Sequence, residues 1–317
     1  MTDKLKVLLI EPNYKNKYPP LGLMKLSAFH EDRNDTVHAF KGNNSDFNKK
    51  PMFESEYDRI YISTVFTFQY RKTLDAIKLA KKHINETGTI YLGGPGATML
   101  KDKYIEEFEE DYQKGSFVVV EGLLNETDKL GLPKDAYIDK RIPDYGILDE
   151  IDYDYPTNDS YIGYSTRGCP NNCPFCAVPT LEPKYNEYIS LKKIVNGIKK
   201  RYGEKRHLLL MDNNVLASDR FEDIINDIID LGFEKGAMDS GGRKRYVDFN
   251  QGLDARFLTE KKAKLLGKIA IRPARVAFDH VESEDLYKEK IRLLAENGVK
   301  DLSNFLLYLP VEQYLYE

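Results

Sequence analysis

Short apolar runs that read as buried strands alternate with segments of helical periodicity along most of the 317-residue chain, and this alternation constrains the fold most strongly. In the first half we expect strands at 6–12, 59–66, 89–97 and 116–122, and helices at 21–32 and 70–85. Strands and helices that alternate at this spacing form a parallel sheet covered by helices on both faces. The first half is therefore predicted to have an α/β fold.

The second half repeats the alternation. We expect strands at 161–168, 207–214, 246–255, 275–279 and 304–310, and helices near 190–202, 219–231, 259–268 and 283–297. Five strands joined by helices in this way fit part of a (β/α) barrel. The second half is thus also predicted to be α/β.

The segment between the two halves, residues 127–160, carries three prolines and several Asp and Tyr, and it lacks a sustained period. We expect it to link a domain at 1–126 to a domain at 161–317. After the last expected strand only VEQYLYE remains, whereas a six-stranded barrel needs a further helix and strand. The barrel is therefore expected to lack its last strand.

The composition limits the kinds of partner that we expect for this protein. Hydrophobic residues at 41% and charged residues at 31% are typical of a globular protein, and the net charge of −4 argues against a generally cationic nucleic-acid binder. The apolar run VLLI at 7–10 is too short for a signal sequence or a membrane span. A cytoplasmic protein with no membrane partner and no strong sign of nucleic acid is the expectation.

All three cysteines fall within eight positions, in the stretch STRGCPNNCPFCA at 165–177. Two prolines exclude a helix there, and a loop can turn three sulfurs toward one point. An odd cluster of thiols is no disulfide framework, and thiolates favour zinc, copper(I) or iron–sulfur clusters. Structural zinc takes four ligands, whereas three thiolates on a four-iron cluster leave one iron open. The alternative is three unpaired buried cysteines, although core cysteines usually scatter.

The spacing resembles the signature of the radical S-adenosylmethionine (SAM) superfamily, C-x3-C-x-aromatic-C, with Phe175 as the aromatic residue. The resemblance implies that Cys169, Cys173 and Cys176 hold a [4Fe–4S] cluster whose fourth iron is chelated by SAM. One electron from the cluster would cleave SAM to methionine and a 5′-deoxyadenosyl radical that abstracts hydrogen from an unknown substrate. In this superfamily the cluster loop follows the first strand of a partial barrel. A reductase, a flavodoxin or a ferredoxin would supply the electron.

The resemblance extends to the strand after the cluster loop. Members of the superfamily usually end this strand with Gly-Gly-Glu, which holds the methionine amino group, whereas this chain has MDNN at 211–214. That ending is closer to Asp-Asn variants of the cobalamin-domain subfamilies. Asp212, followed by Asn213, is expected to accept a hydrogen bond from the SAM amino group, because an ammonium needs an acceptor. The alternative is that Asp212 only caps the end of the strand.

The next strand end, FNQGLDARF at 249–257, brings three polar side chains into a row. Arg256 has the planar fork that suits the methionine carboxylate of SAM. Asp254 or Gln251 could reach the ribose hydroxyls or the substrate. A surface or core role is the alternative for each.

The start of the chain, with EPNYKNKYPPLGLMKLSA, the turn GGPGA and the strand end VVVEG, resembles the Rossmann-like, cobalamin-binding-type domain that precedes the barrel in one radical SAM subfamily. Many such domains carry Asp-x-His-x-x-Gly, whose histidine ligates cobalt. The stretch here reads STVFTFQYRK, without histidine, and His38 has the wrong spacing. This departure argues against a histidine ligand to cobalt. Some members bind cobalamin without that histidine, so cobalamin stays open as an alternative cofactor.

The sequence therefore predicts a radical SAM enzyme with a [4Fe–4S] cluster and SAM as cofactors. A cobalamin-dependent radical methyltransferase is one alternative. A non-catalytic iron–sulfur protein that binds or transfers electrons is another.

Overall fold

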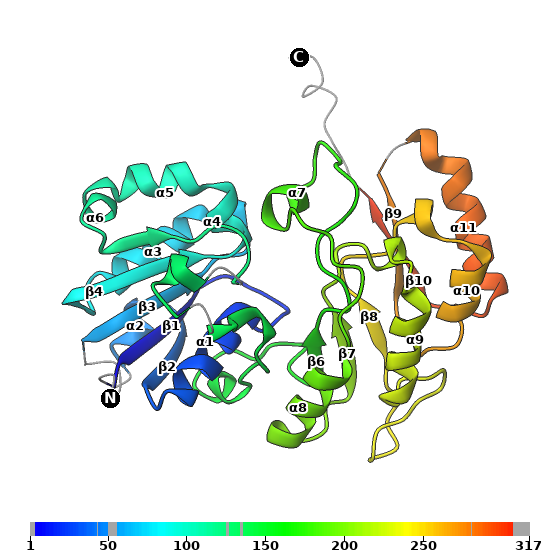
Figure 1. Ribbon diagram of the computed structural model, residues 1–317, viewed down its shortest axis with the longest axis horizontal. Coiled ribbons are helices and arrows are strands. Elements are labelled where there is room, and N and C mark those ends of the chain that lie inside the picture. Colours follow the sequence, from blue (N-terminus) through cyan, green and yellow to red (C-terminus); the bar gives the residue numbers. More distant parts are fainter. Residues whose placement is uncertain are drawn as a thin grey trace. The chain divides into compact units, whose positions relative to one another are not determined.

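The computed structural model describes residues 4–42, 44–49, 56–124, 127–133, 136–279 and 281–306. The chain divides into two compact units, Met1–Asn158 and Asp159–Glu317 (Figure 1). Both units combine helices with parallel strands, which confirms the predicted α/β class. Within the described ranges, no helix is long and apolar enough to cross a membrane.

The sheet of the first unit has five parallel strands in the order β2-β1-β3-β4-β5. They are β1 (Lys6–Pro12), β2 (Thr36–Gly42), β3 (Tyr57–Ser63), β4 (Ile84–Gly93) and β5 (Phe117–Val119). Four of them coincide with expected strands. The additional strand, β2, reads TVHAFKG, and its polar His38 and Lys41 make its apolar pattern weak.

The helices of the first unit are α1 (Leu21–Asp32), α2 (Asn44–Phe47), α3 (Tyr70–Ala80), α4 (Pro95–Met99), α5 (Lys101–Glu107) and α6 (Glu109–Gln113). The helix expected at 21–32 coincides with α1. The helix expected at 70–85 is shorter, because α3 ends at Ala80 and Ile84 already begins β4.

Side chains of the central strands alternate between the two faces of this sheet, as the pleat of a strand requires. Leu8 and Ile60 pack in the same hydrophobic core as Ile77 of α3. Tyr61 is on the other face, where its hydroxyl lies 3.1 Å from Nε2 of His30 in α1. The sheet therefore buries apolar side chains on both faces, as expected of a parallel sheet.

The described residues between 127 and 158 belong to the first unit and form short 3₁₀ helices and turns. Lys25 of α1 forms an ion pair with Asp139 at 3.0 Å. Ser27 of α1 donates to the carboxylate of Asp144 at 2.6 Å. As a boundary between two domains, residues 127–160 remain a prediction.

Among the described residues of the second unit, five parallel strands overlap the expected ones: β6 (Ser160–Gly163), β7 (His207–Leu210), β8 (Val247–Phe249), β9 (Ala274–Phe278) and β10 (Leu302–Leu306). The strands β6, β7 and β8 are shorter than expected at 161–168, 207–214 and 246–255, because the chain turns into loops before these segments end. One sheet has the order β6-β7-β8, and β9 pairs with β10. Isolated parallel bridges, Val247 with Ile271 and Leu253 with Val276, connect the two groups. The last residues of the strand expected at 304–310, and VEQYLYE after it, lie outside the described residues.

Helices follow these strands as a partial barrel requires. They are α7 (Val178–Leu181), α8 (Lys192–Tyr202), α9 (Phe221–Asp230), α10 (Glu260–Leu266) and α11 (Glu284–Glu296). The strands β6, β7 and β8 are parallel neighbours, so their carboxyl ends meet at one edge. The cysteine loop, the MDNN segment and the QGLDAR segment all begin at this edge.

Candidate functional site

The cysteine loop leaves β6 and runs without a strand or helix until α7 begins at Val178. All three thiols are free and partly buried, and the backbone N–H of Cys176 donates to the carbonyl of Cys173 at 3.0 Å. Burial raises the pKa of the Cys176 thiol, and the charges of Cys173 and Cys169 raise it further. The loop thus brings the three sulfurs near one another.

The thiols do not form a ready-made site for a single ion: no group of three His, Cys, Asp or Glu side chains in the described part of the chain has that geometry. A four-iron cluster makes a different demand, because each thiolate binds its own iron. The sulfurs therefore need not converge on a single point. Three clustered thiolates without a fourth fit such a cluster with one iron left open.

Each of the three sulfurs receives at least one N–H group. The backbone N–H of Asn171 points at Sγ of Cys169 at 3.4 Å, and that of Val178 points at Sγ of Cys176 at 3.5 Å. Donors of this kind stabilise the thiolate form, which is the form that ligates iron. At Cys176 the N–H of Val178 thus opposes the effect of burial, which still raises the pKa of the thiol.

Gly168 makes the sharp turn that precedes Cys169. Its φ is +72°, and a Cβ there would lie 2.5 Å from the carbonyl oxygen of Lys184. A side chain would collide with backbone, so only glycine fits. The backbone N–H of Gly168 donates to Glu182 at 2.7 Å, and the same carboxylate oxygen accepts from Asn213 at 3.0 Å. Asn213 thus supports the loop through Glu182, a residue that the sequence did not single out.

Asp212, at the end of β7, is fully buried. Its Oδ1 accepts hydrogen bonds from the backbone N–H and the hydroxyl of both Ser165 and Thr166, which begin the cysteine loop. Its Oδ2 has no hydrogen-bond partner among the described residues. Burial raises the pKa of Asp212 to about 6, and the hydrogen bonds oppose this shift. Contact between Asp212 and the amino group of SAM stays a prediction. The hydrogen bonds show that Asp212 holds the start of the cysteine loop in place.

Asp254 and Arg256 lie together after β8. The Arg256 guanidinium binds the carboxylate of Asp254 through Nε at 2.8 Å and Nη2 at 2.7 Å, and it reaches Sγ of Cys173 at 3.8 Å. The fork expected to bind the carboxylate of SAM is therefore already paired with a carboxylate of the protein. Arg256 is about half exposed, and its role toward SAM remains a prediction.

The remaining expected site residues are at the surface. Phe175 is 41% exposed within the cysteine loop, and Gln251 is exposed in the turn after β8. The sequence did not single out Asn171 or list Asn214 as a site residue, although Asn214 belongs to the MDNN segment. Both become visible only through their contacts with Cys169 and Asp254.

The corresponding edge of the first unit is filled by a tyrosine. The carboxyl ends of β1 and β3 form the topological switch point, where sheets of this order usually bind ligands. Tyr14 is only 2% exposed there, donates to the carbonyl of Ser63 and accepts from the N–H of Val65, both at 3.3 Å. It thus bridges the two strand ends.

Beside it lies a buried ion pair between Glu11 of β1 and Lys41 of β2, at 3.0 Å. Burial raises the pKa of Glu11 and lowers that of Lys41. The Lys41 ammonium lies 3.9 Å from the ring centre of Tyr153 and 4.9 Å from that of Tyr155, whose hydroxyl also donates to Glu11. Side chains of the unit itself thus cover the carboxyl ends of β1 and β2.

The described histidines of the first unit lie away from this edge. His30 lies in the last turn of α1, where it pairs with Asp35, and burial lowers its pKa to about 4. His38 lies within β2, and His83 accepts a backbone bond from Tyr57 at the start of β3. The residues described here do not fit a cobalamin held through a histidine.

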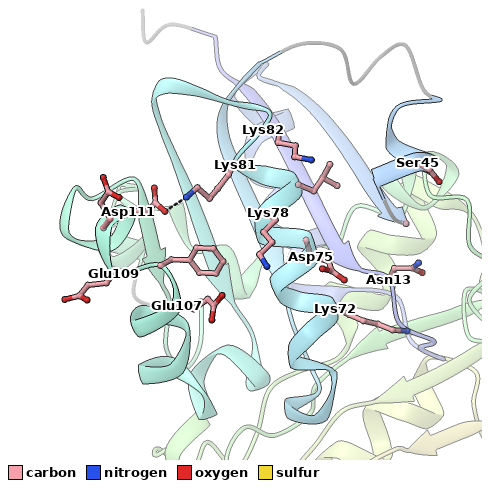
Figure 2. A pocket seen from close by; sticks show the side chains of 15 residues that line it. Asn13, Ser45, Lys72, Asp75, Lys78, Lys81, Lys82, Glu107, Glu109 and Asp111 are labelled. Carbon is pink, nitrogen blue, oxygen red and sulfur yellow. Dashed lines mark hydrogen bonds and ion pairs between the residues drawn. The ribbon is translucent and has the colours of Figure 1, made fainter.

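A hollow of about 890 Å³ lies elsewhere on the first unit, around α3 (Figure 2). Lysines of α3 and the turn after it face acidic side chains near α5 and α6, and Lys81 pairs with Asp111 at 2.5 Å. Its lining includes none of the residues of the cysteine loop. Exposed charges of this kind are typical of a solvated surface, so the hollow adds nothing to the candidate site.

One family model matches a large part of the second unit. Residues 164–314 match the radical SAM superfamily. No curated protein matches the chain.

Two solved structures are similar in fold. The radical S-adenosylmethionine methyltransferase TsrM from Kitasatospora setae, with cobalamin and a [4Fe–4S] cluster bound, is 15% identical with a TM-score of 0.65; the match covers 96% of this chain and 70% of TsrM. The cobalamin-dependent S-adenosylmethionine radical enzyme OxsB, with aqua-cobalamin and S-adenosylmethionine bound, is 15% identical with a TM-score of 0.67, and the match covers 98% of this chain and 51% of OxsB. The chain thus spans about half the length of OxsB, and at this identity the likeness concerns the fold.

Proposed function

We propose that this protein is a radical SAM enzyme: it cleaves SAM reductively and acts on a substrate that is still unknown. The match of residues 164–314 to the radical SAM superfamily supports this proposal. The observation that carries this proposal is the partly buried loop in which N–H groups point at all three cysteine sulfurs. Neutral, unpaired thiols gain little from such donors, whereas thiolates that hold a metal or a cluster are stabilised by them.

The residues after the ends of β6, β7 and β8 would have different roles in this reaction. Cys169, Cys173 and Cys176 would hold a [4Fe–4S] cluster, and when bound this cluster would supply the electron that cleaves the sulfonium of SAM. Asp212 holds the start of the loop in place. Arg256 brings a positive charge to Cys173.

Anaerobic reconstitution with iron and sulfide tests the proposal. We expect about four irons per chain, as cubane ligation requires. On addition of dithionite and SAM, methionine and 5′-deoxyadenosine should form, as measured by mass spectrometry. Stoichiometric zinc without iron uptake would contradict a cluster. A cluster that neither binds nor cleaves SAM would favour the non-catalytic alternative, an electron-transfer protein.

A cobalamin-dependent radical methyltransferase is a second candidate function. It is favoured by the likeness of the whole chain in fold to TsrM and OxsB, two enzymes that bind cobalamin. Two observations argue against it. Tyr14 fills the switch point, and none of the described histidines of the first unit lies at the carboxyl edge of its sheet. The two sets of observations make a direct binding test decisive.

We expect the purified protein to retain little corrinoid after mixing with hydroxocobalamin and desalting, because the switch point is filled. The absorption spectrum of the desalted protein measures this. A Tyr14→Ala variant, which opens the same space, serves as the comparison. A stable complex of the wild-type protein, with a spectrum of imidazole on cobalt, would show that the first unit does bind cobalamin through a histidine.

We also propose that the electron comes from a reductase, a flavodoxin or a ferredoxin, and that the protein works in the cytoplasm. A donor protein that supports SAM cleavage in place of dithionite would support the first proposal.

A further inference from the structure

The carboxylate of Asp254 gathers hydrogen-bond donors from three separate segments. Its Oδ2 accepts from Nδ2 of Asn171 at 2.9 Å, from Nδ2 of Asn214 at 3.0 Å and from Nη2 of Arg256 at 2.7 Å. These partners come from the cysteine loop, from the end of β7 and from the residues after β8. One carboxylate thus ties these segments together.

Each of these partners also has an N–H group directed at a cysteine sulfur. The backbone N–H of Asn171 and the side-chain Nδ2 of Asn214 lie 3.4 and 3.5 Å from Sγ of Cys169. Nη2 of the Arg256 guanidinium lies 3.8 Å from Sγ of Cys173. One carboxylate therefore fixes the donors on two of the three sulfurs.

Asp254 itself is held firmly. Its side chain is 14% exposed, and its Oδ1 accepts from the backbone N–H of Arg256 at 3.1 Å. The preceding residue, Leu253, donates its N–H to the carbonyl of Arg275 at 2.7 Å, at the bridge that joins this segment to β9. The carboxylate is thus anchored to the parallel strands and can orient partners that are themselves on loops.

We infer that Asp254 is a positioning residue that holds Asn171, Asn214 and Arg256 against the sulfurs of Cys169 and Cys173, and thereby raises the reduction potential of the cluster that these cysteines bind. The inference rests on the proposed function. Hydrogen bonds to cysteine sulfur and nearby charge set the potential of an iron–sulfur cluster. Donors to sulfur stabilise the added negative charge of the reduced state, so their loss lowers the potential.

The direction in which an Asp254 substitution changes the reduction potential distinguishes two explanations: Asp254 holds the donors in place, or it acts only through its own negative charge. If Asp254 acted only through its own negative charge, an Asp254→Asn substitution would raise the potential. If Asp254 acts by holding the donors, the result is the opposite. Both oxygens of its carboxylate accept hydrogen bonds, so the NH2 group of an asparagine must face N–H donors. Those donors then move away from the sulfurs, and the reduction potential falls. An Asp279→Asn variant provides the matched charge control, since Asp279 acts on Cys176 by its charge.

The experiment is a spectroelectrochemical titration of the reconstituted protein, followed by electron paramagnetic resonance of the reduced cluster. We expect Arg256→Met and Asp254→Asn each to shift the reduction equilibrium about tenfold toward the oxidised state, which is about 59 mV for one electron. Because Asp254 acts partly through Arg256, the double variant should shift less than the sum of the two. Iron content should stay at the wild-type value.

Asp254→Glu covers the case in which the asparagine variant fails to assemble a cluster. It keeps the charge but displaces the carboxylate, so positioning predicts a lower potential and a pure charge effect predicts none. A raised potential in Asp254→Asn, or wild-type potentials in both Asp254 variants, would overturn the inference while the cluster itself remains. Absence of iron in the wild-type protein would instead overturn the proposed function.

Discussion

Replacement of Cys173 by alanine will leave the reconstituted protein without a [4Fe–4S] cluster and without SAM cleavage. The chain holds three cysteines, all in one loop, so no other thiol can replace the lost ligand. A cluster held by two thiolates has two open irons and is expected to be lost on desalting. Iron content and the visible absorption of the variant, measured after anaerobic reconstitution, check the result.

The neighbouring exposed residue offers a matched control for this variant. Asn172 lies in the same loop beside Cys173, and an Asn172→Ala substitution removes no sulfur. This variant should assemble the cluster as the wild-type protein does. A Cys173→Ala protein that still binds about four irons, the number of a complete cubane, would show that the cysteines are not the ligands.

The order of most strands and of the longer helices could be read from the sequence, because most of these elements have a clear apolar pattern. The short helices α4, α5 and α6 were not predicted. HLLL of β7 and ARVAF of β9 are short apolar runs, and the helices between them alternate apolar and polar faces. The strand β2 was missed because TVHAFKG lies at the edge of its sheet and is only partly buried. An edge strand needs fewer apolar residues, so its pattern is weak.

The site could be predicted only where its residues are close in sequence. The three cysteines share one loop, and their spacing carries the information. The contact between Asn171 and Asp254 joins residues 83 positions apart, and that between Asn214 and Asp254 joins residues 40 apart. The fold brings these pairs together, and no local pattern records it. For the same reason Asp254 and Arg256, which the sequence suggested as separate contacts to SAM or substrate, proved to bind each other.

Substitution of Asp212 by alanine will lower the stability of the protein by about 2 kcal/mol, because buried donors then lose their acceptor. The backbone N–H and hydroxyl groups of Ser165 and Thr166 all donate to Oδ1 of Asp212, which is fully buried. Asp212→Asn retains an oxygen at this place and should lose less. Urea unfolding of the cluster-free proteins at neutral pH measures the difference. Equal losses of unfolding free energy in the alanine and asparagine variants would show that the hydrogen bonds of Asp212 do not hold the start of the loop.

The raised pKa of Asp212 adds a pH dependence with a definite sign. Burial raises the pKa from its ordinary 3.8 to about 6, so between these values the folded protein binds more protons than the unfolded chain. The contribution of this group to stability is therefore complete below about pH 4 and is lost as the pH rises through about 6. Relative to Asp212→Asn, which cannot titrate there, the wild-type protein should be more stable at about pH 5 than at about pH 7.5 by roughly 1.4 kcal/mol, the value of one pKa unit. A difference between the two proteins that stays constant over this range would show that Asp212 ionises normally, and that its buried carboxylate is compensated by a partner of its free oxygen.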